Sequence, residues 1–140
     1  MKRGFSLLEI VISLFLLSFL IVLASTSFLN LAPKYKLKKA VWEINSRLNY
    51  ARFKAIFEGR SIRIKFGRES YAIEKYDEQK KIWQLEEKSY LEGVSIQANN
   101  SPTFHPQGTV SNLASISISN SWGRYRITLA ITGRIKILKL

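Results

Sequence analysis

The order of apolar and polar residues marks out a first stretch that is long and nearly uncharged. Residues 5–32 are predominantly apolar, and their only ionisable side chain is Glu9. As a helix, this stretch is about 42 Å long, which exceeds the roughly 30 Å hydrocarbon core of a bilayer. It is therefore predicted to be a membrane-spanning helix.

A second apolar pattern follows, and it has the period of a helix. Apolar residues recur at spacings of three and four, with charged residues on the other faces: Leu37, Val41, Ile44, Leu48, Ala51 and Ala55. One long helix over roughly residues 5–58 is predicted, apolar first and amphipathic from about residue 34. Gly59 is expected just past its end. Pro33 removes a backbone donor and clashes with the preceding turn, so a kink or short break is expected there.

After Gly59 the period of the pattern changes to two. Residues 61–66 alternate strictly between polar and apolar, residues 67–70 read as a turn, and residues 71–76 form the returning strand. Further strands are predicted at residues 83–90, 94–98, 115–120, 125–131 and 134–139, with turns at 99–102 and 105–108. Antiparallel strands with short turns, covered on one face by a helix, predict an α+β domain.

Charge is distributed unevenly along the 140 residues. The net charge is +12, and all ten acidic residues lie at or before Glu92. Residues 93–140 carry five Lys and Arg and no acid, so this part attracts nucleic acid, lipid headgroups or an acidic neighbouring subunit. A basic protein that is kept soluble by its charge has the same composition.

Four cations of this basic part are predicted to share one face of a sheet. Arg124 and Arg126 alternate with apolar residues on one predicted strand, and Arg134 and Lys136 do so on the last one. If the two strands are hairpin neighbours, the four cations form one patch with Trp122 at its edge. The patch is a candidate phosphate-binding surface, and the alternative is a solvated outer face where charges belong in any case.

Residues that could support catalysis are sparse. The chain has one His, one Asp and no Cys, which excludes disulfides, thiolate metal sites and cysteine nucleophiles. His105 lies in a predicted turn, where a structural role is favoured. A serine triad would need Asp77 and a serine that no nucleophile-elbow pattern places. No phosphate-binding loop or zinc spacing is present. We expect no enzyme activity, no cofactor and no metal site.

The first nine residues combine features that rarely occur together. Lys2 and Arg3 precede a Gly-Phe pair, and Glu9 lies one turn into the apolar helix, where a charge is costly and by default functional. Residues 4–9 (GFSLLE) resemble the type IV prepilin signal. The resemblance implies that a prepilin peptidase cuts after Gly4 and methylates the new N-terminus at Phe5. It also implies that this amine pairs with Glu9 between subunits as a filament assembles.

Two simpler interpretations of these residues fit less well. A secretory signal has an apolar core of only about 7–15 residues before a small-residue cleavage site. A generic single-pass anchor fits the length but explains neither the Gly-Phe pair nor Glu9. Under the positive-inside rule, Lys2 and Arg3 favour a cytoplasmic N-terminus. Counting charges alone mildly favours the reverse orientation, because Lys34, Lys36, Lys38 and Lys39 flank the other end. The prepilin signal implies a cytoplasmic N-terminus.

The order of one long helix followed by strands resembles the pilin-like architecture, and three segments resemble the GspH/FimT branch of minor pilins. Residues 48–56 (LNYARFKAI) resemble its L-x-x-A-R-x-x-A-I helix end. Residues 103–108 (TFHPQG) resemble its F-x-P-x-G turn, and residues 132–137 (TGRIKI) resemble its terminal G-R-x-R segment. One departure is Lys136, which stands where the DNA-binding members have a second Arg.

The resemblance implies three parts: a leader at residues 1–4, a transmembrane and assembly segment at 5–32, and a soluble pilin-like domain at 33–140. Such a subunit is a single-pass protein of the inner membrane, with its C-terminal domain periplasmic or external. It joins other pilins in a type II secretion pseudopilus or a type IV pilus, near the tip. The alternative is a FimT-like minor pilin that binds DNA for uptake through Arg124, Arg126, Arg134 and Lys136. The sequence leaves both alternatives open.

Overall fold

The computed structural model describes residues 6–140, apart from the side chains of residues 26–30. One helix, α1 (Leu7–Glu58), accounts for 52 of these residues, as the apolar pattern predicts; the expected start at Phe5 lies outside the described range. Of the kink or short break expected at Pro33, the break is not found, because the helix runs through this residue. Proline removes a single backbone hydrogen bond. Leu37, one turn later, is fully buried and holds the next turn in place.

The chain divides into two compact units, residues 1–32 and residues 33–140. In the first unit, the segment Leu7–Ser25 is long and apolar enough to cross a membrane. Its serine hydroxyls donate to carbonyl oxygens one turn earlier, for example from Ser13 to Glu9 at 2.7 Å and from Ser18 to Leu14 at 2.7 Å. These hydroxyls therefore place no unsatisfied donor on the apolar surface.

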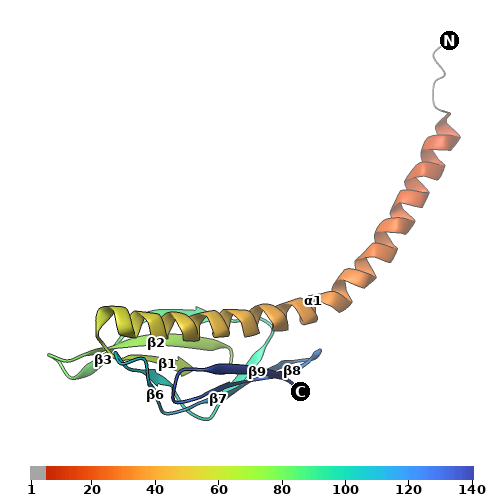
Figure 1. The fold of residues 1–140 in the computed structure, drawn as a ribbon. Coiled ribbons are helices and arrows are strands. Elements are labelled where there is room, and N and C mark those ends of the chain that lie inside the picture. The colour runs from red at the N-terminus through yellow and green to blue at the C-terminus, as the bar shows by residue number, and fades with distance from the viewer. Residues whose placement is uncertain (1–5) are drawn as a thin grey trace. The chain divides into compact units, whose positions relative to one another are not determined.

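The second unit packs the C-terminal half of α1 on two antiparallel sheets (Figure 1). The five-stranded sheet has the order β3-β2-β1-β5-β6, formed by β1 (Ile62–Phe66), β2 (Ser70–Asp77), β3 (Ile82–Tyr90), β5 (Thr103–Phe104) and β6 (Val110–Ser111). The four-stranded sheet has the order β4-β7-β8-β9, formed by β4 (Ser95–Ala98), β7 (Ser115–Asn120), β8 (Gly123–Leu129) and β9 (Ile135–Lys139). The predicted α+β fold is confirmed.

One hydrophobic core joins the helix to both sheets. All six residues of the predicted helical stripe are buried, and Ala40 extends the stripe. The five-stranded sheet contributes Ile62 and Ile64, and the four-stranded sheet contributes Ile116 and Ile127, all fully buried. Because the buried hydrophobic residues of this core lie between Leu37 and Leu129, residues 33–140 have a core of their own.

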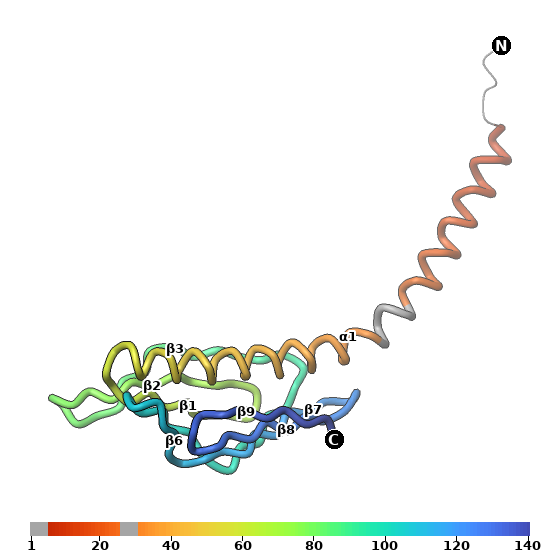
Figure 2. The backbone as a smooth tube through the Cα atoms, viewed as in Figure 1, coloured from red at the N-terminus to blue at the C-terminus, as the bar shows by residue number. Residues whose placement is uncertain are grey.

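The differences from the predicted strands lie in short elements and strand ends. β5 and β6 are two residues long each, too short to show a period of two, and they flank the expected turn at residues 105–108. β8 begins two residues earlier than predicted, since Asn120 pairs with Gly123 and leaves only Ser121 and Trp122 in the β7–β8 turn. The hairpin of β2 and β3 extends past the C-terminal end of α1 (Figure 2).

Candidate functional site

The first candidate site is the beginning of the apolar helix. Gly4 and Phe5 lie outside the described residues. Glu9 is in the first turn of α1, where the helix dipole favours a negative charge, and it is exposed. Within residues 6–140 no basic side chain pairs with its carboxylate. A cation that pairs with Glu9 would therefore belong to the N-terminal residues outside this range or to another molecule.

The second candidate site is the hairpin of β8 and β9, which are neighbours as expected. Arg126 is opposite Leu138, and Lys136 is opposite Thr128. By the alternation of side chains along a strand, Arg124, Arg126 and Lys136 share the face that points away from buried Ile127. Arg134 lies just before β9, where its carbonyl oxygen accepts from the Ala130 amide at 2.9 Å. The structure thus brings the four predicted cations onto one hairpin.

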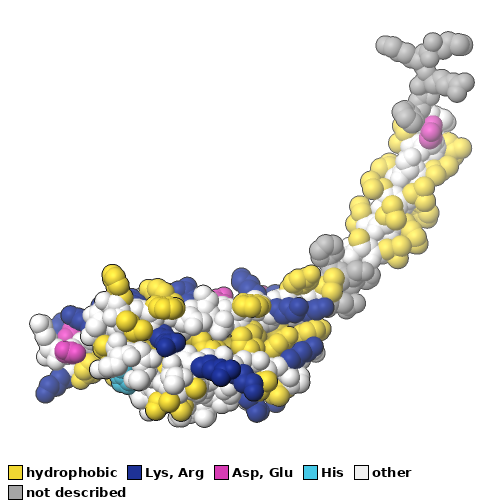
Figure 3. Space-filling view, viewed as in Figure 1, with side chains coloured by type: hydrophobic (Ala, Val, Ile, Leu, Met, Phe, Trp, Pro, Cys, Tyr) yellow, Lys and Arg dark blue, Asp and Glu magenta, His cyan; other side chains and the backbone are white. Residues whose placement is uncertain are grey.

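These four cations are exposed, and none of them forms an ion pair with any described residue. The space-filling view shows Lys and Arg side chains gathered over β9, with no acidic side chain visible there (Figure 3). The sequence pattern predicted Trp122 at the edge of this patch, but the structure places its ring elsewhere. Its ring lies against Lys34 and Lys139 instead. Lys139 is opposite Tyr125, so its side chain lies on the other face of the hairpin. Lys139 is therefore not part of the patch.

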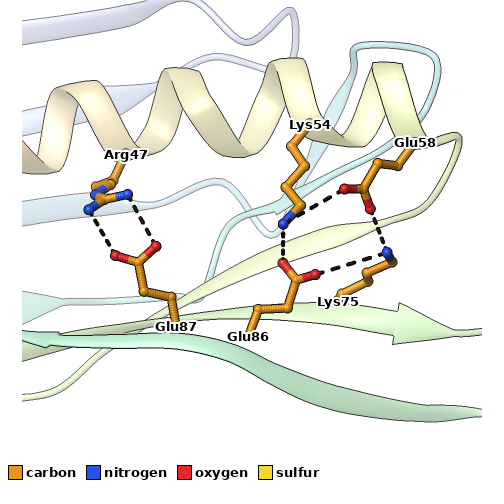
Figure 4. A network of polar contacts seen from close by, with 6 residues as sticks. All are labelled: Arg47, Lys54, Glu58, Lys75, Glu86 and Glu87. Atoms are coloured by element: carbon orange, nitrogen blue, oxygen red, sulfur yellow. Dashed lines mark hydrogen bonds and ion pairs between the residues drawn. The ribbon is translucent and has the colours of Figure 1, made fainter.

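Several cations near the five-stranded sheet have acidic partners instead. Between α1 and β3, Arg47 pairs with Glu87 at 2.8 Å and Lys54 pairs with Glu86 at 2.5 Å (Figure 4). Lys75 of β2 pairs with Glu58 at 2.5 Å, and the hydrogen bond from Lys75 lowers the pKa of the Glu58 carboxyl below its ordinary value. These charged side chains therefore pair with one another within the domain.

The three segments that resemble the GspH/FimT branch meet near the end of α1. Arg52, from the helix segment, lies so close to Gly133 that a Cβ added there would be 2.6 Å from the Arg52 Nε. A Cβ on Gly108 would lie 3.4 Å from Ile56 Cδ1 and 4.0 Å from an Arg52 terminal nitrogen. Both glycines have positive φ, at 81° for Gly108 and 79° for Gly133. The motif residues therefore form one packing site, which the sequence pattern marked without revealing its internal contacts.

His105 has a structural setting. Its Nδ1 is 3.2 Å from the Ser61 hydroxyl, and its Nε2 is 2.8 Å from the Ser111 hydroxyl. Asp77 is engaged elsewhere, because its carboxylate accepts from the backbone amides of Gln79 and Lys80 at 3.0 and 3.1 Å. The Asp77–His105 pairing that a serine triad requires is thus not formed among the described residues.

Comparisons with known proteins bear on both units. Residues 1–25 match the family model described as the prokaryotic N-terminal methylation motif. The structure is similar to the minor pseudopilin EpsH from the type 2 secretion system of Vibrio cholerae, with a TM-score of 0.64 and 16% identity over 74% of this chain and 97% of that one. It is also similar to the type IV minor pilin FimU of Pseudomonas aeruginosa, with a TM-score of 0.61 and 20% identity over 75% and 90% of the two chains. A search of curated proteins finds no match.

Proposed function

We propose that this chain, type IV pilin-like in its N-terminal motif and its fold, is a minor pilin or pseudopilin subunit. In this proposal a prepilin peptidase cuts after Gly4, Phe5 becomes the methylated N-terminus, and the subunit assembles with other pilins into a filament. The observation that carries the proposal is the methylation motif of residues 1–25 on a chain whose remaining residues have the fold of solved minor pilins. The neighbours are filament subunits rather than enzymes, which agrees with a structural role.

Glu9 has a specific part in this proposal. A carboxylate that is alone in hydrocarbon takes up a proton or requires a cation. The amine of Phe5 on an adjacent subunit is a suitable cation, because both charges then leave the lipid together. Removing one half of such a buried pair commonly costs about 3–5 kcal/mol. Glu9 would therefore act during assembly, whereas the fold of residues 33–140 does not depend on it.

Within the pilin-like proteins, we place the chain in the GspH/FimT branch, as an inner-membrane subunit near the tip of a filament. The packing of Arg52 on Gly133 supports this assignment, because it joins two of the three segments that resemble the branch. The solved neighbours come from a secretion system and from a pilus, so both kinds of filament remain in the proposal.

The test replaces Glu9 in the full chain and measures assembly in membranes. Glu9→Ala and the nearly isosteric Glu9→Gln should still insert, because removing a charge from an apolar helix eases insertion. Crosslinking to partner pilins should fall strongly in both variants, and Glu9→Asp should retain more of it. Ser13→Ala, one turn further along the same helix, is the matched control and should crosslink like the wild type. Wild-type crosslinking by Glu9→Gln would contradict the pairing.

A second candidate function is DNA capture for uptake, and a specific observation favours it. Arg124, Arg126, Arg134 and Lys136 are exposed on one hairpin and have no acidic partner among the described residues. Cations that neutralise phosphates release counterions, so binding to duplex DNA should weaken steeply as salt rises and should show little sequence preference.

The DNA test uses residues 33–140 and duplex DNA at several salt concentrations. Arg134→Ala with Lys136→Ala should weaken binding and reduce the salt slope by roughly one for each phosphate that is no longer neutralised. Lys80→Ala with Lys88→Ala removes the same charge from exposed positions on the β2–β3 side and should have a much smaller effect. Unchanged binding by the first variant would remove its residues from the interface. No binding at low salt would favour the secretion filament.

A further inference from the structure

A basic and aromatic cluster lies on the helix side of the four-stranded sheet, opposite Arg124, Arg126 and Lys136. Trp122, in the β7–β8 turn, has the Lys139 Nζ 4.4 Å and the Lys34 Nζ 5.6 Å from its ring centroid. Asn120 fixes this turn against the helix: its Nδ2 donates to the Pro33 carbonyl at 2.7 Å, and its Oδ1 accepts from the Trp122 amide at 2.9 Å. The cluster thus joins the last strand to the first turn of the 33–140 unit.

The lysines of this region are mostly uncompensated. Lys36 pairs with Glu92 at 2.8 Å, and this contact holds the pKa of the Glu92 carboxyl below its ordinary value. By contrast, Lys34, Lys38, Lys39 and Lys139 have no ion pair with any described residue. Lys34 and Lys139 contact the Trp122 ring, and Lys38 follows Lys34 by one helical turn. Positive charge is therefore available to an external anion beside a tryptophan, a side chain that is favoured at membrane interfaces.

The chain length fixes how far this cluster can be from the bilayer. The span Leu7–Ser25 has 19 residues, about 28 Å of helix, which roughly fills the hydrocarbon core. Lys34 follows Ser25 by nine residues within the same helix, a rise of about 14 Å. The Lys34 backbone therefore lies within about 14 Å of the hydrocarbon edge, next to the headgroup layer. The Trp122 ring lies beside the Lys34 ammonium group, 5.6 Å from its Nζ.

An apolar groove adjoins the cluster and makes the surface amphipathic. The groove has a volume of about 410 Å³ and is lined by Lys38, Val41, Trp42, Tyr125 and Ile137. Tyr125 is the register partner of Lys139, so the groove and the cluster are continuous along the β8–β9 hairpin. A surface with cations beside an apolar groove fits an anionic amphiphile better than a free phosphate ion.

We propose that Lys34, Lys38, Trp122 and Lys139 form a docking surface for the anionic headgroups of phospholipids, on the side of the membrane from which the domain emerges. The proposal rests on the membrane anchoring in the proposed function. In this proposal the lysines after the membrane span bind lipid headgroups. This role explains why lysines are abundant at this end of the span, which the positive-inside rule alone does not explain. The surface would hold the subunit against the bilayer until assembly lifts it out.

The test uses the full chain in nanodiscs, with Trp42→Phe and Trp83→Phe leaving Trp122 as the only tryptophan. Brominated phosphatidylglycerol, mixed with plain phosphatidylcholine, should quench Trp122 more than brominated phosphatidylcholine mixed with plain phosphatidylglycerol. Lys34→Gln with Lys139→Gln should reduce this lipid preference, by up to about fivefold for each lysine removed. Lys34→Arg with Lys139→Arg should keep it. Arg126→Gln with Lys136→Gln removes the same charge from the opposite face and should also keep it.

Three results would overturn the proposal: equal quenching by the two lipids in the parent chain, an equal reduction in the Arg126 and Lys136 control, or disappearance of the preference on adding inorganic phosphate or duplex DNA. Failure of the anchoring is distinguishable. A chain that alkaline carbonate extracts from membranes contradicts the proposed function itself, whereas a retained chain with equal quenching contradicts only the lipid surface.

Discussion

The two sheets under α1 differ in what they do with their charges. At the five-stranded sheet, Glu74 accepts from Arg63 and from Lys65 at 3.1 Å, and Glu86 and Glu87 pair with cations of the helix. At the four-stranded sheet, the cations of the β8–β9 hairpin have no acidic partner among the described residues. The difference follows from the sequence, which has no acid after Glu92. The first sheet forms ion pairs within the fold, whereas the second leaves the cations of its last hairpin to external partners.

The largest effect should come from the part that both sheets share. Leu48 is fully buried in α1, in the core that contains residues of both sheets. Leu48→Ala should lower the free energy of unfolding of residues 33–140 by about 2–5 kcal/mol. Urea unfolding, followed by Trp83 or by Trp122 alone in single-tryptophan variants, should shift equally for the two probes. A shift seen by Trp83 only would mean that the sheets unfold independently.

A smaller loss of stability is expected where the β8–β9 hairpin packs against the helix. This contact is made by packing and not by ion pairs. Gly133→Ala forces a side chain into a positive φ and against Arg52, and should cost about 2 kcal/mol of unfolding free energy. Gly59 also has positive φ but has no atom within 4 Å of an added Cβ, so Gly59→Ala should cost only about 1 kcal/mol. In an Arg52→Ala background the two costs should become equal. An unchanged difference would exclude the Arg52 side chain as its cause.

Acid should lower the stability of residues 33–140 through the ion pairs of the five-stranded sheet. Burial of the Glu74 carboxyl opposes ionisation, but the hydrogen bonds from Arg63 and Lys65 outweigh it and lower its pKa below 4.5. Because the folded pKa is lowered, this stabilisation is complete above about pH 4.5 and is lost as the pH falls through the folded value. Glu74→Gln should cost about 1 kcal/mol at pH 7 and flatten the loss of stability below pH 4.5.

The control for this prediction is Glu69→Gln, an exposed acid with no ion pair to any described residue. Urea unfolding of residues 33–140 at stepped pH values should show little change for it at pH 7. An equal loss of stability for both variants at pH 7 would mean that the Glu74 ion pairs do not stabilise the sheet.

The smallest effect on stability should come from the cations of the other sheet. Arg126→Gln with Lys136→Gln removes two exposed charges that have no partner within the described chain, so the free energy of unfolding should change by less than about 0.5 kcal/mol. The measurement is urea unfolding at low and high salt. A decrease of more than about 1 kcal/mol would mean that these side chains support the fold rather than serve an external ligand.

Periodic patterns predicted most of this fold, and the failures have physical causes. The helical stripe from Leu37 to Ala55 and the alternation in β1 depend on burial along one face, which a sequence displays directly. β5 and β6 are too short for a period, and the helix through Pro33 depends on tertiary packing of the following turn. The grouping of Arg124, Arg126, Arg134 and Lys136 on one hairpin was predicted from the alternation of side chains along the strands. The cluster of Lys34, Trp122 and Lys139 was not predicted, because it joins residues that are about a hundred positions apart in the sequence.

The processing of the N-terminus is the central claim, and one measurement tests it directly. The full chain should be expressed with a prepilin peptidase, purified from membranes, and its N-terminal peptide analysed by mass spectrometry. The account predicts a chain that begins at Phe5 and carries a methyl group on its amine. A chain that still begins at Met1 in cells where the peptidase processes another prepilin would contradict the account.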